Sequence, residues 1–187
     1  MNLSVRRLEV GDAMAVRTLR LAALRLFPHN FGSAWEEEAQ QPFAFWENRL
    51  RGPARTLGAE SDRELVGMAS VQANSRVKLA HVAEIGGFYV RPEFHRRGVG
   101  RLLMQSVMEL LRSGEFPTPV KFATLTVVAN NEAARRLYES FGFGVCGKLE
   151  QQLCVDGAYY DELLMRARIS LLLLFWVVES PTELFHF

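Results

Sequence analysis

A basic, glycine-containing stretch has the residue types best suited to a chemical task. Residues 88–103 read FYVRPEFHRRGVGRLL, so an apolar, strand-like run ends at Val90 and a helical pattern begins near Gly98. The first turn of a helix has unpaired backbone N–H groups and a partial positive charge, which together can bind a diphosphate. Gly98 and Gly100 lack the Cβ atoms that would keep a phosphate away from the backbone. Positive charge is added around the glycines by Arg96, Arg97 and Arg101. The pattern predicts a phosphate-binding loop, with a solvated basic turn as the alternative.

Two common phosphate-binding motifs do not fit this segment. No Gly-Lys-Ser/Thr follows, which excludes a Walker loop, and the third glycine of the dinucleotide-binding fingerprint is missing. The segment instead resembles motif A of the GNAT superfamily of N-acetyltransferases, Gln/Arg-x-x-Gly-x-Gly/Ala. Residues His95 to Gly100 match it, with His95 where the family usually has glutamine or arginine. The departure matters little, because such a loop binds phosphate through backbone N–H groups.

A second motif follows at residues 128–143, which read VANNEAARRLYESFGF. It resembles GNAT motif B, Asn-x-x-Ala-x-x-Leu-Tyr-x-x-x-Gly-Phe, and agrees at every fixed position. Asn131 is predicted to cap a short helix on which Ala134 and Tyr138 share a face, and Gly142 is predicted to end it. The two motifs span residues 80–143, and the predicted order of elements matches the family over residues 1–168.

The resemblance implies that acetyl-CoA donates an acetyl group. In the family the fourth and fifth strands, here Leu79–Val90 and Val120–Val128, separate near their C-terminal ends. The pantetheine arm would pair with the backbone of Phe88 and Val90, and a nearby N–H would polarise the thioester carbonyl. The predicted cofactor-binding residues are Phe88, Tyr89, Val90, His95, Arg96, Arg97, Gly98, Val99, Gly100, Arg101, Asn130, Asn131, Ala134 and Tyr138.

Two side chains are candidates for proton transfer. A lysine-type amine has a pKa near 10.4, so only about one in 10³ is neutral at pH 7 and a general base is useful. Some GNAT enzymes have a glutamate in a similar Ala-Glu-Ile context, and strand alternation predicts Glu84 on the same face as Phe88 and Val90. A water chain or a purely structural salt bridge of Glu84 are the alternatives. Tyr138 is the candidate general acid for the departing CoA thiolate; otherwise it is a core tyrosine.

Periodicity and turn residues predict a mixed α/β fold. The resemblance implies the GNAT fold: a twisted sheet of about six to seven strands, splayed between strands 4 and 5 and flanked by about four helices. The predicted helices are 13–27 after an Asp12 cap, Trp35–Leu50, Gly98–Arg112 and Asn131–Phe141. The predicted strands are a first strand within 1–11, Arg55–Glu60, Glu64–Asn74, Leu79–Val90, Val120–Val128, and a hairpin of Gly142–Leu153 and Tyr159–Ile169 over Asp156-Gly157.

Composition argues against several other functional classes, including nucleic-acid-binding, membrane-bound and metal-binding proteins. The chain has 187 residues and a net charge of +1, so no global field points to nucleic acid or an anionic membrane. Its two cysteines, Cys146 and Cys154, make no disulfide framework and favour a reducing, cytoplasmic setting. The four histidines are too isolated to predict a metal site: His29, His81, His95 and His186. The N-terminus lacks the apolar core of a signal peptide.

The domain is predicted to cover residues 1–168, followed by an atypical apolar extension over 169–187. The run Ile169–Val178 is about half of the ~20 residues that a membrane-spanning helix needs. The extension would lengthen the last strand, bury a partner surface or reflect an altered reading frame.

The acceptor is less constrained than the donor. We expect a primary amine on a small or amino-acid-like molecule; the alternatives are a protein N-terminus or lysine, and a non-catalytic acyl-CoA sensor. Residues 24–33 are expected to contact the acceptor. Glu36–Glu38 would attract a cationic acceptor or form a solvated helix start, and Tyr159–Asp161 would wall the acceptor site or have packing and turn roles. Monomer and homodimer both remain open.

Overall fold

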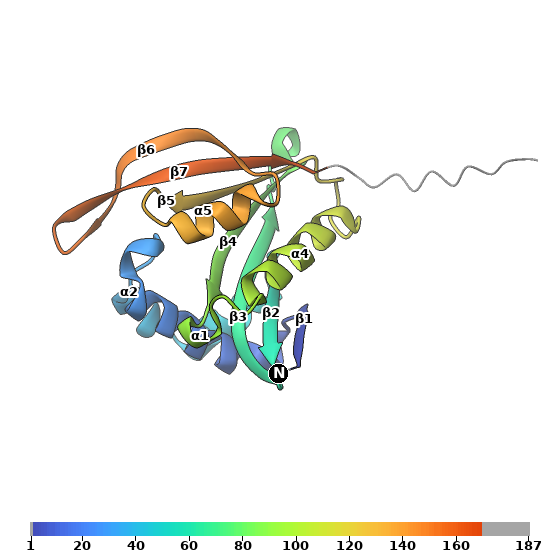
Figure 1. The fold of residues 1–187 in the computed structure, drawn as a ribbon. Coiled ribbons are helices and arrows are strands. Elements are labelled where there is room, and N and C mark those ends of the chain that lie inside the picture. Colours follow the sequence, from blue (N-terminus) through green and yellow to red (C-terminus); the bar gives the residue numbers. More distant parts are fainter. Residues whose placement is uncertain (1, 170–187) are drawn as a thin grey trace, which may run out of the picture.

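The computed structural model describes residues 2–169 as one mixed sheet covered by helices on both faces (Figure 1). The seven strands are β1 (Leu3–Arg7), β2 (Arg55–Ser61), β3 (Glu64–Ala73), β4 (Val82–Val90), β5 (Phe122–Val128), β6 (Gly144–Val155) and β7 (Ala158–Arg168). The α-helices are α1 (Ala13–Leu26), α2 (Trp35–Ala39), α3 (Phe43–Arg51), α4 (Val99–Arg112) and α5 (Glu132–Glu139). Short 3₁₀ turns are η1 (Val10–Asp12), η2 (Pro28–Asn30), η3 (Val77–Leu79) and η4 (Pro92–Phe94). The predicted mixed α/β fold is confirmed.

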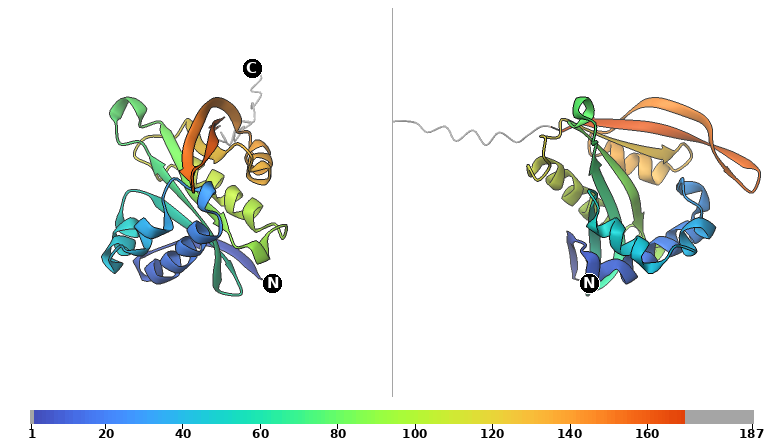
Figure 2. Two further views of the ribbon diagram at one scale, coloured as in Figure 1. Left: turned by 90° about the vertical axis from the view of Figure 1, so that its left-hand side faces the viewer. Right: turned by 180° about the vertical axis from the view of Figure 1, so that it is seen from behind.

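The sheet has the strand order β1-β2-β3-β4-β5-β7-β6. Its neighbours are antiparallel except for β4 and β5, which are parallel. Two residues with positive φ, Asp156 and Gly157, connect β6 to β7, which confirms the predicted turn. The long β6–β7 hairpin extends beyond the rest of the sheet toward the side where α2 lies (Figures 1 and 2).

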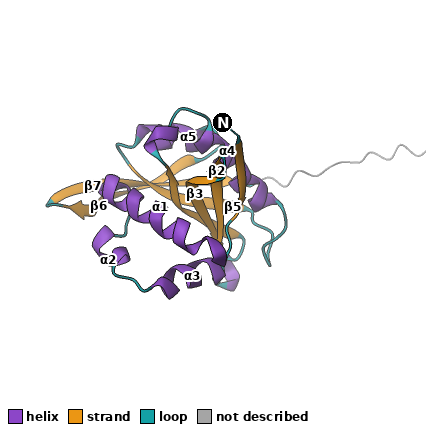
Figure 3. Cartoon of the chain, turned by 90° about the horizontal axis from the view of Figure 1, so that it is seen from below, coloured by secondary structure: helices purple, strands orange, loops and turns teal. Residues whose placement is uncertain are grey.

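Two apolar clusters hold the helices on opposite faces of the sheet (Figure 3). On one face, α4 buries Leu103 and Val107, which recur at helical spacing and pack in the larger cluster. On the other, Val16 and Leu19 of α1 lie in a second cluster with Trp46 of α3. The sheet is therefore held firmly on both sides.

The structure corrects the boundaries of two predicted elements. The helix predicted over Trp35–Leu50 is divided into α2 and α3, because Pro42 has no N–H to donate and disfavours the helical conformation of the residue before it. This break gives five α-helices in residues 2–169 where about four were expected. The strand predicted from Leu79 begins at Val82, since Leu79 ends the 3₁₀ turn η3.

Asp12 is the N-cap residue of α1, as predicted, but its side chain makes no capping hydrogen bond to this helix. Its carboxylate accepts the backbone N–H of Glu9 at 2.8 Å and binds the Arg6 guanidinium at 2.7 Å. The predicted extension over residues 169–187 lies outside the described residues except for Ile169, which is buried and donates its N–H to the Lys121 carbonyl. Within residues 2–169, no helix is both long and apolar enough to cross a membrane.

Candidate active site

The sheet opens between β4 and β5. These strands pair over three residues only, from Val82–Phe122 to Glu84–Thr124. β5 continues to pair with β7 as far as Val128, whereas the later part of β4 pairs with β3 alone. A pocket of about 550 Å³ lies at this opening, lined by both strands together with residues of α1, α5 and β7. The predicted splay is confirmed, and it leaves backbone groups of β4 without a sheet partner on one side.

A β-bulge at Gly87 changes which side chains of β4 share a face. Ser70 pairs with Gly86 and Met68 pairs with Tyr89, so β4 has one residue more than β3 over this interval. Gly87 has φ +61°, which glycine adopts without strain.

The bulge overturns the predicted position of Glu84. Before it, Ile85 points into the α4-side core and Glu84 points to the opposite face. After it, Val90 and Phe88 pack on the α4 side and Tyr89 packs on the α1 side. Glu84 therefore does not share a face with Phe88 and Val90, because the extra residue reverses the alternation.

The loop before α4 has the conformation that an anion-binding helix start needs. Gly98 is the N-cap residue and has φ +82°, while Arg96 has φ +58°. A Cβ atom built on Gly98 would meet no atom within 4 Å, and Gly98 is exposed, so the backbone at the start of the helix is open to solvent. At Gly100 such an atom would lie 3.6 Å from Leu137 Cδ2, which is ordinary contact. The helix N-terminus is thus accessible to a ligand at the end of the pocket.

The other residues of this loop have different surroundings. His95 donates from Nε2 to the Val90 carbonyl at 2.7 Å, which ties the loop to the end of β4. The guanidinium carbon of Arg97 lies 5.8 Å from the Phe94 ring centroid, and that of Arg101 lies 5.5 Å from the Phe141 centroid. Val99 is fully buried, so its side chain packs in the core and does not face a ligand.

Tyr138 is positioned by a well-capped short helix. The Asn131 side chain accepts the Ala134 N–H at 3.1 Å, as predicted for the start of α5. The Tyr138 ring meets Phe88 edge-on, at 5.8 Å between centroids and 84° between planes. Burial raises the pKa of Tyr138 well above its ordinary value, so the phenol is protonated at neutral pH.

The main pocket brings together most of the predicted site. The predicted site residues that line it are Glu84, Phe88, Tyr89, Val90, His95, Arg96, Gly100, Asn131, Ala134 and Tyr138. The predicted residues outside this lining are Arg97, Gly98, Val99, Arg101 and Asn130. The chemistry-bearing side chains thus meet at one opening although they come from distant parts of the chain.

The segment expected to contact the acceptor also reaches the pocket. Phe27, Asn30 and Phe31 line it from the connection after α1. The His29 ring stacks on Tyr160 of β7, at 5.2 Å between centroids and 16° between planes. Since η2 also contacts β6, the β6–β7 hairpin and this connection close over one side of the opening.

Sequence reasoning missed a buried ion cluster beside the pocket. Arg20 Nη2 lies 2.8 Å from Glu38 Oε1, and both side chains are less than a tenth exposed. Arg49 approaches the other Glu38 oxygen at 3.6 Å. Burial favours a higher pKa for Glu38, but the hydrogen bond and charge of Arg20 outweigh it and hold the pKa below its ordinary value. Glu38 therefore binds arginines of the protein itself. The expectation that Glu36–Glu38 would attract a cationic acceptor is wrong for Glu38.

Glu162 of β7 is a second missed residue. Its side chain is buried and lines the main pocket. In the sheet, the residue pairs with Val128 of β5. Burial raises the pKa of Glu162, and the Thr126 hydroxyl lowers it in part. No motif or spacing singled this residue out, because its burial depends on how the hairpin packs against β5.

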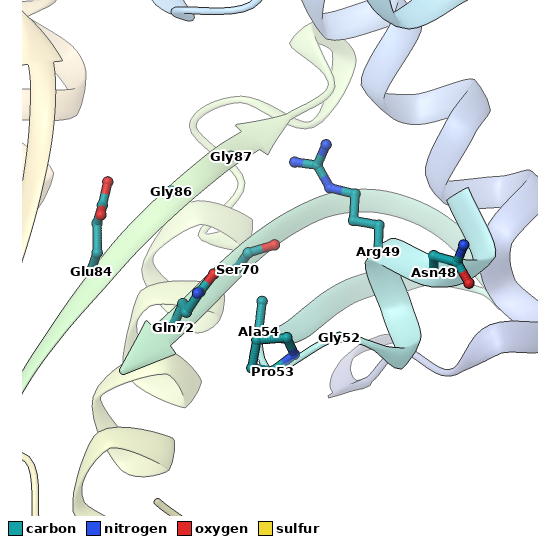
Figure 4. Close-up of a pocket in the computed structure, with 10 residues that line it drawn as sticks. All are labelled: Asn48, Arg49, Gly52, Pro53, Ala54, Ser70, Gln72, Glu84, Gly86 and Gly87. Atoms are coloured by element: carbon teal, nitrogen blue, oxygen red, sulfur yellow. The ribbon is translucent and has the colours of Figure 1, made fainter. Parts of the chain in front are cut away.

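A second pocket of about 420 Å³ adjoins the first on the α3 side (Figure 4). The two pockets share Glu84, Gly86 and Gly87. Polar side chains from two other elements line the second pocket: Asn48 and Arg49 of α3, and Ser70 and Gln72 of β3. Glu84 therefore stands where a cleft through the sheet meets a polar recess.

Comparison with known proteins identifies the family. Residues 20–143 match the model described as the acetyltransferase (GNAT) family. The L-amino acid N-acetyltransferase AaaT of Escherichia coli is 29% identical over 127 residues, 67% of this chain and 75% of that protein. The N-alpha-acetyltransferase RimI of Mycobacterium tuberculosis is 31% identical over 118 residues, 63% of this chain and 70% of that protein. The structure of yncA from Salmonella typhimurium with its cofactor acetyl-CoA has a TM-score of 0.72 at 21% identity, covering 91% of this chain and 95% of that chain. The chain therefore belongs to the GNAT family of acetyltransferases and is an acyltransferase.

Proposed function

We propose that this protein transfers an acetyl group from acetyl-CoA to the primary amine of a small, amino-acid-like molecule, with both substrates bound together. The observation that carries the proposal is the opening between β4 and β5, which has an accessible helix N-terminus at one end and both Glu84 and Tyr138 in its lining. Acetyl-CoA would supply an activated acetyl thioester. An elongated donor with a diphosphate suits this opening, because the cleft runs beside unpaired backbone of β4.

Each end of the donor has proposed partners in the chain. The first turn of α4 and the loop from His95 to Gly98 would hold the diphosphate, with positive charge from Arg96, Arg97 and Arg101. Open space in front of Gly98 supports this assignment. Phe88 and Val90 would pair through their backbones with the pantetheine arm. The carbonyl of Val90 already accepts from His95, so the N–H of that residue is the group left for the ligand.

The proposed reaction is a direct displacement. The neutral amine forms a C–N bond with the thioester carbonyl carbon, and the C–S bond breaks. The attacking nitrogen becomes positively charged as the C–N bond forms and then loses a proton to Glu84, directly or through water, while the leaving thiolate takes a proton from Tyr138. The products are an N-acetyl amine and free coenzyme A. The position of Tyr138 in the same pocket lining as Glu84 supports its role as the acid.

A contact across one side of the opening supports a small molecule over a peptide. The His29–Tyr160 stack bridges the connection after α1 and the last hairpin. AaaT, a relative named for L-amino acid acetylation, supports the same choice, whereas RimI, named as an N-alpha-acetyltransferase, represents the alternative.

The proposal is tested by calorimetry with coenzyme A and by thiol release from acetyl-CoA with a panel of amines, amino acids and short peptides. We expect coenzyme A to bind and small amino compounds to be acetylated. Turnover with peptides alone would reassign the acceptor, and binding without turnover would indicate a sensor. Absence of any coenzyme A binding would refute the proposal.

A further inference from the structure

The pocket on the α3 side has one cationic and one anionic side chain in its lining. The cation is Arg49 and the anion is Glu84; the other lining residues are neutral. Figure 4 shows Arg49 extending from α3 toward Gly87, with Glu84 at another point along β4. A Cβ atom built on Gly87 would lie 3.9 Å from Arg49 Nη2, so the guanidinium reaches the strand at the edge that both pockets share.

Arg49 is poorly compensated by its own protein. Within residues 2–169 its only ion-pair partner is Glu38, at 3.6 Å, which is longer than a hydrogen bond. Glu38 already accepts three short contacts from Arg20, at 2.8, 3.1 and 3.2 Å. Two guanidinium groups thus share one carboxylate, and the cluster has an excess of one positive charge.

Arg20 brings the same cluster to the side of the main pocket. Its side chain is 5% exposed, lines that pocket, and has a buried Nη1 without a hydrogen-bond partner. Its guanidinium carbon lies 4.7 Å from the Phe31 ring centroid, which compensates the charge only in part. Uncompensated positive charge in a largely buried place is unfavourable unless an anion joins it.

We infer that Arg49, supported by the Arg20–Glu38 pair, binds the carboxylate of the acceptor, so that the substrate class is free amino acids. The amine of such a molecule would lie toward Glu84 and the opening to the donor. The carboxylate would complete the charge balance of the cluster through a forked, charge-assisted contact with the guanidinium. The inference rests on the proposed function for the identity of the reacting amine. It excludes peptide N-termini, whose first carbonyl is an uncharged amide.

The test compares three forms of each acceptor: the amino acid, its carboxamide and its decarboxylated amine. Acetylation is followed by thiol release, and binding is measured by calorimetry on protein saturated with coenzyme A. For the wild type we expect the amino acid to have a KM about 10- to 100-fold lower than the other two. Arg49→Gln should raise the KM of the amino acid by that factor and leave the KM values of the other two unchanged.

Two further variants serve as controls for charge and for geometry. Arg51→Gln removes an equal charge from an exposed position of the same helix, and we expect it to leave all three KM values unchanged. Arg49→Lys retains the charge but not the forked geometry, so it should recover part of the discrimination. The carboxamide and the amine serve as internal controls for folding of the Arg49 variants.

The outcomes separate this inference from the proposed function. Equal KM values for the three forms in the wild type, or an equal loss for all three in Arg49→Gln, would overturn the carboxylate site. Failure of coenzyme A to bind would refute the proposed function, yet amino acid titration of the free protein would still report Arg49-dependent binding. If no amino acid binds under either condition, the inference is wrong.

Discussion

Replacing Glu38 with glutamine tests whether the buried ion cluster organises the acceptor side of the site. The change keeps the shape of the side chain and removes its charge, which leaves Arg20 buried without a counter-ion. Removing one partner of a buried pair costs about 3–5 kcal/mol, because the remaining charge stays desolvated. For a domain of this size, that loss lowers the melting temperature by roughly 10 °C.

Thermal and denaturant unfolding would measure this loss, with Glu36→Gln as the control. Glu36 is exposed on the same short helix, so its replacement should change the free energy of unfolding by less than about 0.5 kcal/mol. The pKa of Glu38 is lower in the folded state than its ordinary value. Its stabilising effect is therefore present above about pH 4.5 and is lost as the pH falls through the folded-state pKa.

The gap between wild type and Glu38→Gln should accordingly be full at pH 7 and shrink in strong acid. If Glu38→Gln melts within about 2 °C of the wild type at pH 7, the charge of Glu38 does not stabilise the fold. A gap that is independent of pH would show that the effect comes from packing and not from charge.

Four further changes test the site. Gly98→Ala should weaken coenzyme A binding in calorimetry more than Gly114→Ala, since both glycines have positive φ (+82° and +79°) and open space but only the first lies at the proposed diphosphate site; equal affinities would remove the loop from binding. Tyr138→Phe should lower kcat about 10²-fold or more with the affinity for coenzyme A retained, and unchanged turnover would exclude it as the acid. Glu84→Gln should lower kcat/KM most on the acidic side of the pH profile, and a profile identical to wild type would reassign the base. Glu162→Gln should be more stable than the wild type at pH 7 to 8 but not at pH 4. The reason is that a carboxyl group whose folded-state pKa is raised loses its favourable contribution to stability as the pH rises through that pKa, and glutamine does not ionise. Denaturant unfolding of both proteins at the two pH values would show no such difference if burial does not raise the pKa of Glu162.

Much of the fold could be predicted because local signals and the overall architecture agree. The amphipathic pattern of α4, the Asn131 cap of α5 and the Asp156-Gly157 turn each depend on residues close in sequence. The splayed sheet was also predicted, but from a family resemblance in two motifs and not from the strands themselves.

The parts that failed depend on small local irregularities with long-range effects. Pro42 divides one predicted helix, which turns α3 so that it presents Arg49 to the second pocket. One extra residue at Gly87 reverses the alternation of β4 and moves Glu84 to the other face from Phe88. Simple alternation of side chains along a strand does not allow for an inserted residue, so it assigns every side chain after the bulge to the wrong face.

The sequence by itself determined the family, the order of elements, and the two motifs whose backbone and tyrosine line the opening. Only the tertiary structure decided which charges meet: Arg20 and Arg49 come together on Glu38, and Glu162 is buried beside the same cleft. The physical reason is the distance along the chain over which each interaction acts. Caps, turns and helical faces depend on neighbours within a few residues, whereas the charge balance of a pocket depends on side chains brought together by packing from distant segments.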